Sequence, residues 1–378
     1  MKQKWWILLT LLLCGCGASS QPDQTGAVQN DRPRLSASME ETAENVAAVE
    51  KNENLEKNPS NSNQNPGEGQ NWTVFAMDTV MQFDAYGGSA NLQEKVKRRV
   101  EELEGELSTT QENSDIFHLN QEKTAELSAD TRYLMQEALA LGAETDGALD
   151  ISIYPIVRSW GFTTGNYRVP SESERESLLK SVDYRLVGLG ADMASIEPGM
   201  MVDLGGVGKG FTGDEVVKAM KEDGVTSALF SLGGNIQTIG TKPDGEKWYV
   251  GIKDPESDGY LGGVGVQDEA VITSGGYERY FTDNDGTIYW HIMDPSTGTP
   301  AHSGLISVTI IGPCGLRCDG LSTALFVMGR EKAAAHWTAH QDYEAVLVDE
   351  RGTIWLTPGL KDRFIPVDQG ETREIRIL

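Results

Sequence analysis

The sequence predicts an α+β fold (mixed α/β) with a largely antiparallel sheet and flanking helices. Between residues 227 and 313, six short apolar or alternating segments are bounded by Gly, Pro, Asp or Asn, which is typical of antiparallel strands. Before and after them, apolar residues recur at helical spacing. Because helices and strands are mixed without strict alternation, a regular parallel βαβ succession is not predicted.

The chain of 378 residues begins with a segment typical of export. Lys2 and Lys4 precede an apolar run that ends at Leu13, and this pattern predicts a secretory signal too short to act as a membrane span. Leu13, Gly15 and Cys16 also fit a lipoprotein signal, with residues 1–15 removed and lipid on the Cys16 sulfur. We therefore expect a lipid-anchored, extracytoplasmic protein, the alternative being an ordinary cleaved signal.

Residues 16–70 are poor in large apolar side chains and rich in Asn, Gln, Ser, Glu and Pro, so we expect a disordered tether. Residues 71–378 are long enough for a large, well-filled domain. The formal charge of −25 argues against nucleic acid as a partner and against docking on anionic headgroups.

The N-terminal half of the domain is predicted to be mainly helical after one strand. The strand covers residues 72–86 and breaks at 77–79, whereas residues 113–120 look like a loop. Asp150 stands inside an apolar run, so its carboxylate must be hydrogen-bonded or must face a ligand. The predicted helices cover residues 92–107, 131–144 and 171–180.

The C-terminal half is predicted to supply most of the sheet. Cys314 and Cys318 are interpreted as two small core thiols rather than a disulfide. The predicted strands cover 227–240, 247–255, 262–275, 277–283, 286–295 and 305–313, followed by helices at 319–328 and 331–340 and a hairpin of 344–349 with 352–357.

The segment MVDLGGVGKGFTGD, residues 201–214, is the strongest local signal. An apolar run ends in Asp203, four glycines follow within six residues, Lys209 lies among them, and a helix is expected from about 211 to 222. Such a turn brings backbone N–H groups close to a phosphate, and the acid and lysine suggest a charged, metal-bridged ligand. The alternative is a tight turn without a ligand.

Two common nucleotide motifs do not fit this segment. Gly208, Gly210 and Gly213 match G-x-G-x-x-G formally, but the following strand offers no acid for a ribose. Lys209 is followed by Gly210 rather than Ser or Thr, which excludes a Walker A loop.

Two further motifs carry candidate chemistry. Asp319 and Thr323 would project from one face of a helix, and such oxygen ligands suit Mg²⁺. Taken alone, the pair is better explained by an N-terminal Asp on the helix dipole with a buried Thr. His291, close to Asp294-Pro295, is a candidate base or aromatic contact. A His₃ zinc site is not predicted, because only His336 and His340 share a metal-binding spacing and both are interpreted as ordinary.

Together these segments resemble the ApbE family of FAD:protein FMN transferases. Residue 78 is Asp where many members have Gly, and residue 322 is Ser where some have a second acid. The segments that carry the resemblance occur in the family's order: MDTVMQF (77–83), TDGALDISIYPIVRSWGF (145–162), DLGGVGKGFTGD (203–214), SLGGNI (231–236), TSGGYERYF (273–281), HIMDPSTGTP (291–300) and DGLSTALFVMG (319–329).

The resemblance implies that FAD is the substrate, that FMN passes to a Thr or Ser hydroxyl of an acceptor flavoprotein, and that AMP is released. It implies His291 and Lys209 as catalytic residues. It implies FAD contacts at Met77, Gly147, Ala148, Leu149, Asp203, Lys209 and the Met293 backbone, and an Mg²⁺ site at the Gly206 carbonyl, Asp319 and Thr323. The alternatives are an Mg²⁺-dependent FAD pyrophosphatase and a non-catalytic flavin-binding lipoprotein.

Overall fold

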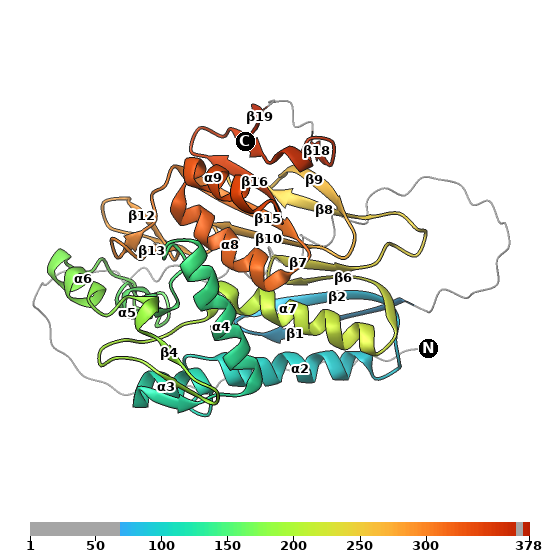
Figure 1. Cartoon of the computed structure of the whole chain (residues 1–378). Helices are drawn as coiled ribbons and strands as arrows, with labels where there is room; N and C mark the ends of the chain where they lie inside the picture. The colour runs from blue at the N-terminus through green and yellow to red at the C-terminus, as the bar shows by residue number, and fades with distance from the viewer. Residues whose placement is uncertain (1–68, 368–372) are drawn as a thin grey trace, which may run out of the picture. The chain divides into compact units, whose positions relative to one another are not determined.

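A nine-stranded sheet runs through the domain (Figure 1). The computed structural model describes residues 69–367 and 373–378. Neighbouring strands of this sheet are antiparallel except β17 and β19, which are parallel, so the predicted fold class is confirmed. Its strands, in spatial order, are β1 (Gly69–Ala76), β2 (Thr79–Gly87), β6 (Val225–Leu232), β7 (Asn235–Ile239), β10 (Ala270–Gly275), β15 (Leu305–Gly312), β16 (Glu344–Asp349), β17 (Ile354–Leu356) and β19 (Ile375–Ile377).

Helices cover one face of this sheet and a smaller sheet covers part of the other. Ile272, Ile310 and Leu347 pack against the helices, whereas their neighbours Val271 and Ile311 pack against the smaller sheet, as the two-residue period of a strand requires. The helices are α2 (Leu92–Leu107), α4 (Ala129–Glu144), α7 (Gly205–Glu222), α8 (Gly315–Met328) and α9 (Arg330–His340), and the smaller sheet holds β8 (Trp248–Lys253), β9 (Tyr260–Val266) and β18 (Phe364–Pro366).

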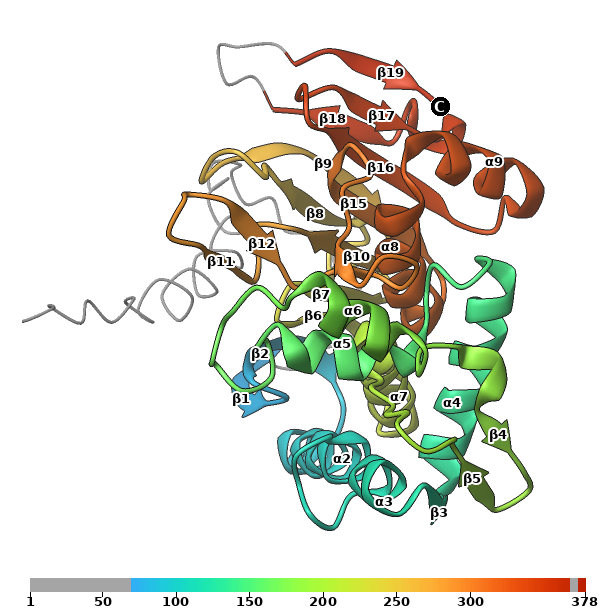
Figure 2. The ribbon, with the colours of Figure 1, turned by 90° about the vertical axis from the view of Figure 1, so that its left-hand side faces the viewer.

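Short elements complete the domain, and α5 and α6 lie side by side among them (Figure 2). Trp160 and Phe162 follow α5 and pack with Phe281 and Tyr289 of a separate hairpin. These elements are α3 (Asp115–Glu122), β3 (Thr124–Glu126), η1 (Ile151–Ile153), α5 (Tyr154–Ser159), α6 (Glu172–Leu179), η2 (Tyr184–Leu186), β4 (Gly188–Leu189), β5 (Met193–Ser195), β11 (Tyr280–Thr282), β12 (Ile288–Trp290), β13 (Met293–Asp294), β14 (Thr299–Pro300) and η3 (Pro358–Leu360).

The structure corrects three local predictions. Residues 115–122 form helix α3 instead of a loop, because the Ser114 hydroxyl accepts a hydrogen bond from the Phe117 N–H and caps the helix. Helix α7 begins at Gly205 rather than near 211. The expected break at 77–79 is the turn of the β1–β2 hairpin, where Met77 and Asp78 have positive φ angles of 51° and 57°.

Two other expectations concern the termini and the thiols. The first strand begins at Gly69, two residues before the expected domain start, while the signal, Cys16 and most of the tether lie outside the described residues. Cys314 and Cys318 are both free, as predicted. In the part of the chain that the structure describes, no helix is long and apolar enough to cross a membrane.

Helices α7 and α8 cross in direct backbone contact. A Cβ added at Gly210 would lie 2.2 Å from the Gly315 carbonyl oxygen and 2.6 Å from Asp319 Cβ. Gln237 of β7 donates from Nε2 to the Gly210 carbonyl at 3.1 Å, so the sheet also contacts this point. Glycine at position 210 lowers the helix propensity of α7 but permits this backbone contact. The packing against α8 therefore explains why a glycine-rich segment forms a helix.

The substitution Gly210→Ala should destabilise the domain by about 3 kcal/mol, because the new methyl group overlaps the backbone of α8. Gly105→Ala in α2 is the matched control, since its Cβ would meet nothing within 4 Å. This control should be stabilising by about 0.5–1 kcal/mol. Urea unfolding of both variants measures the difference, and equal stabilities would contradict the proposed contact.

Candidate functional site

The predicted metal ligands meet where the first turn of α7 faces the middle of α8. A Cβ built on Gly206 would lie 3.9 Å from Thr323 Oγ1 and 3.4 Å from Leu149 Cδ1. Asp319 is buried, and its Oδ2 accepts a hydrogen bond of 2.8 Å from the Gly210 N–H. The structure therefore brings Gly206 to Asp319 and Thr323, which lie more than a hundred residues further along the sequence.

A network of hydroxyl groups lies beside these ligands. Ser274 at the end of β10 contacts Thr323 Oγ1 at 3.3 Å and Ser322 Oγ at 2.8 Å. Ser322 is fully buried and donates to the Asp319 carbonyl at 2.8 Å. The Ser322 hydroxyl thus links α8 to β10, which is a positioning role.

Lys209 supplies positive charge to the same site. Burial raises the pKa of Asp319, and the charge of Lys209 and the Gly210 N–H oppose this shift. The surrounding protein also raises the pKa of Glu278, again against the charge of Lys209, although Glu278 is accessible to water.

Asp203 lies at the start of α7. Its backbone N–H donates to the Ile151 carbonyl at 2.8 Å, and its Oδ1 accepts from the Gly205 N–H at 2.8 Å. Burial raises the pKa of Asp203, while the Gly205 N–H and the charge of Arg279 lower it. Asp203 and Arg279 therefore face the same space.

His291 is held in one tautomer by the backbone of Arg279. The Arg279 carbonyl lies 3.2 Å from His291 Nδ1 and also accepts the His291 backbone N–H at 3.0 Å. Because a carbonyl can only accept, Nδ1 carries the hydrogen and Nε2 keeps its lone pair. Burial lowers the pKa of His291 to about 4, with the charges of Arg279 and Lys209 acting in the same direction. The imidazole is thus neutral and able to accept a proton at Nε2.

The corner after α4 turns through residues that tolerate positive φ. Asp146 and Gly147 have φ angles of 52° and 79°, and the Gly147 N–H closes the helix on the Gly142 carbonyl at 2.8 Å. Ala148 is half-buried, and Leu149, whose backbone N–H donates to Thr145 Oγ1 at 3.2 Å, reaches Gly206. The corner therefore borders the site formed by Gly206, Asp319 and Thr323, which we call the α7 site.

Asp150 is hydrogen-bonded rather than aimed at a ligand. It accepts from the Ser152 N–H at 2.8 Å, the Ser152 hydroxyl at 2.6 Å and the Tyr184 N–H at 3.0 Å. Of the two possibilities that the sequence left open, the first is confirmed.

Two predicted FAD contacts lie at the borders of the site. Met77 approaches α7 through its sulfur, 3.6 Å from Thr212 Oγ1, one turn beyond Gly208. Met293 is buried with Trp160 and Phe162, two residues from His291. Its side chain is part of this aromatic cluster, so only its backbone is available for a ligand.

Sequence reasoning missed Ser274, Glu278 and Arg279, although all three stand in the segment TSGGYERYF. The pair of glycines before Tyr277 was the available signal. It also missed Asp214, which accepts from the Gly315 and Leu316 N–H groups at 2.7 and 2.8 Å. Asp214 caps α8 from α7 and so fixes the helix that carries Asp319.

A separate hollow of about 890 Å³ lies near the C-terminal strands. Two of its arginines form ion pairs: Arg373 pairs with Asp254 at 2.7 Å and Arg376 with Glu374 at 2.7 Å. This hollow is a surface ion-pair network and none of the predicted site residues line it.

Comparisons with known proteins agree on one family. The model of the ApbE family matches residues 77–347. An FAD:protein FMN transferase of Klebsiella pneumoniae (strain 342) is 30% identical over 307 residues, which cover 79% of this chain and 95% of that protein. One of Treponema pallidum (strain Nichols) is 32% identical over 296 residues, which cover 73% of this chain and 82% of that protein.

Solved structures give the same result. The crystal structure of the ApbE protein from Thermotoga maritima superposes with a TM-score of 0.73 at 31% identity, over 78% of this chain and 99% of that one. The flavin transferase ApbE from Vibrio cholerae superposes with a TM-score of 0.72 at 27% identity, over 79% of this chain and 100% of that one.

The neutral state of His291 predicts a pH dependence of stability. An unfolded histidine titrates near about 6.5, whereas His291 in the folded protein titrates at about 4. Between these values the unfolded chain binds more protons, so this stabilising contribution is complete above the unfolded pKa and is lost as the pH falls toward the folded pKa.

The substitution His291→Asn should therefore reduce the number of protons that unfolding takes up in this window by up to about one, so that the unfolding free energy depends less steeply on pH. Urea unfolding across the window measures the slope. His118→Asn, at an exposed position of α3, is the control and should keep the wild-type slope. An unchanged slope in His291→Asn would refute the buried neutral state.

Proposed function

This chain belongs to the ApbE family, and on that basis we propose that it transfers FMN from FAD to a Thr or Ser hydroxyl of an acceptor protein and releases AMP. Its relatives are FAD:protein FMN transferases, and the chain is an enzyme of this transferase class. Release of AMP and dependence on Mg²⁺ are the finer parts of the proposal.

The observation that carries the proposal is the convergence of charged and polar groups at the start of α7. Lys209 acts electrostatically on Glu278, His291 and Asp319, which come from three different segments. A pyrophosphate needs such a combination of positive charge, hydroxyl donors and a helix N-terminus. A very acidic protein would otherwise repel this ligand.

The donor set fits a magnesium ion. The Asp319 carboxylate, the Thr323 hydroxyl and the Gly206 carbonyl are all hard oxygen ligands, and a single carboxylate leaves positions for water and phosphate oxygens. Desolvation of the Asp319 carboxylate makes a nearby cation favourable. When bound there, Mg²⁺ would supply Lewis acidity to a phosphate oxygen.

Residues of this chain would neutralise charge, accept the proton and position the flavin. Lys209 would neutralise charge on the pyrophosphate, and the positive end of the α7 dipole would add to this stabilisation. His291 Nε2 would take the proton from the acceptor hydroxyl, since its lone pair is free and its partner on Nδ1 fixes the ring. The Gly147–Leu149 corner would position the flavin half.

The expected lipoprotein signal suggests where this reaction occurs. Residues 1–15 would be removed, Cys16 would carry lipid, and the segment from 16 to 70 would tether the domain at the membrane surface. We propose an extracytoplasmic location from the sequence pattern alone.

The test is incubation of the purified protein with FAD, Mg²⁺ and a candidate acceptor. A mass gain of one FMN on the acceptor with stoichiometric AMP supports transfer. AMP with free FMN and no mass gain would favour the pyrophosphatase alternative, because water then replaces the acceptor hydroxyl. Unchanged FAD would favour the non-catalytic alternative.

The substitution Asp319→Asn should lower kcat by at least about 100-fold, since it removes the only charged ligand of the proposed metal site. The amide oxygen can still accept the Gly210 N–H, so the fold should persist. Asp258→Asn, on an exposed loop, is the control and should leave kcat unchanged. FMN transfer at saturating FAD, with the Tm of each variant, checks this, and near wild-type turnover of Asp319→Asn would refute the metal assignment.

A further inference from the structure

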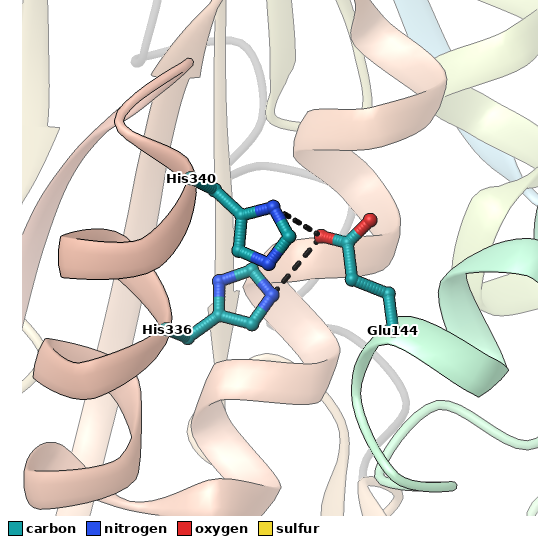
Figure 3. A group of neighbouring side chains, drawn as sticks. All are labelled: Glu144, His336 and His340. Carbon is teal, nitrogen blue, oxygen red and sulfur yellow. Dashed lines mark ion pairs between the residues drawn. The ribbon is translucent and has the colours of Figure 1, made fainter.

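Three side chains that are not part of the α7 site meet between the end of α4 and the last turns of α9 (Figure 3). His336 and His340 lie one turn apart on α9, and Glu144 is the last residue of α4. His336 Nε2 lies 3.0 Å from Glu144 Oε1, and His340 Nδ1 lies 3.7 Å from the same oxygen. The sequence interpreted both histidines as ordinary, because it could not show that Glu144 reaches them.

We propose that Glu144, His336 and His340 form a second metal site, for Zn²⁺ or a similar imidazole-binding divalent ion. Two histidines at i and i+4 on a helix plus one carboxylate are a common set of three protein ligands, with water at the fourth position. Adjacent ligand atoms in a tetrahedral zinc site are about 3.3 Å apart, from a Zn–N length of about 2.0–2.1 Å. The two His-to-Glu144 distances bracket this value, and all three ligand atoms lie within 4.8 Å of one another.

The buried nitrogen of His336 supports the assignment. Nε2 has no aligned hydrogen-bond partner among the described residues, despite the nearby carboxylate. Its other nitrogen, Nδ1, lies 2.8 Å from the Tyr343 hydroxyl. That hydroxyl can accept a hydrogen bond from Nδ1–H, which leaves the Nε2 lone pair for a metal. A histidine that binds a metal through one ring nitrogen usually donates from the other nitrogen to such an acceptor.

Arg317 limits how Glu144 can bind. It donates to Oε1 at 2.8 Å and to Oε2 at 2.9 Å, and it also pairs with Asp342. A carboxylate oxygen has two lone pairs, so Oε1 keeps one for a metal while Arg317 fixes its orientation. Two carboxylates against one guanidinium leave this cluster negatively charged, which favours a cation.

The site would join α9 to the end of α4, directly before the Gly147–Leu149 corner. The proposed site of Glu144, His336 and His340, which we call the α9 site, has two nitrogen ligands and one oxygen ligand. The α7 site offers only oxygen ligands, so the two sites select different ions. Excess Mg²⁺ should therefore occupy the α7 site without displacing Zn²⁺ from the α9 site.

The experiment is calorimetric titration of the full-length protein with Zn²⁺ in excess Mg²⁺. One high-affinity Zn²⁺ should bind per chain, and the Tm should rise by about 5 °C at saturating Zn²⁺. His340→Ala should weaken binding at least about 100-fold, more than the loss of an outer partner would. This residue is partly exposed, so the variant should fold.

Two controls locate the metal. His118→Ala removes an exposed histidine that also pairs with a glutamate four residues away, and it should bind Zn²⁺ normally. Cys314→Ser should also bind normally, which separates the site from the thiols of α8. His336→Gln with a wild-type circular dichroism spectrum should lose binding. Absence of a stoichiometric Zn²⁺ site, or wild-type affinity in His340→Ala, would overturn the proposal.

Discussion

The contact between α7 and α8 is the constraint on which the rest of the site depends. Gly210 and Gly315 allow the two backbones to touch, and the Gly210 N–H donates directly to Asp319. Asp214 of α7 caps α8 at the same crossing. The glycine-rich segment thus fixes the position of the proposed metal ligand through backbone contacts, which are stiffer than contacts between long side chains.

Desolvation sets the chemistry of the groups around this crossing. Asp203, Glu278 and Asp319 are all harder to ionise than free carboxylic acids, and His291 is harder to protonate than a free imidazole. A nearby cation would lower the raised pKa values of the three carboxyl groups, and a nearby anion would raise the lowered pKa of His291. A ligand that brings phosphate and a cation together would satisfy both kinds of group at once.

The same domain offers two chemically different places for a cation. Oxygen ligands gather at α7 and α8, whereas imidazoles gather at the end of α9. α8 connects the two, because Asp319 lies two residues after Arg317, which holds Glu144. The corner after α4 begins three residues after Glu144, and its Leu149 reaches Gly206 of the proposed oxygen-ligand site.

The sequence by itself determined the mixed, mainly antiparallel fold and most helices and strands, because periodicity is local. The family motifs predicted Asp319, Thr323, Lys209 and His291 as site residues. It could not predict α3, which depends on one serine cap, or the early start of α7, where glycine propensity is outweighed by packing. Only the tertiary structure decided that Ser322 faces β10, that Glu278 and Arg279 join the site, and that Glu144 reaches His336. These contacts join residues distant in sequence, and their geometry depends on how the helices cross the sheet.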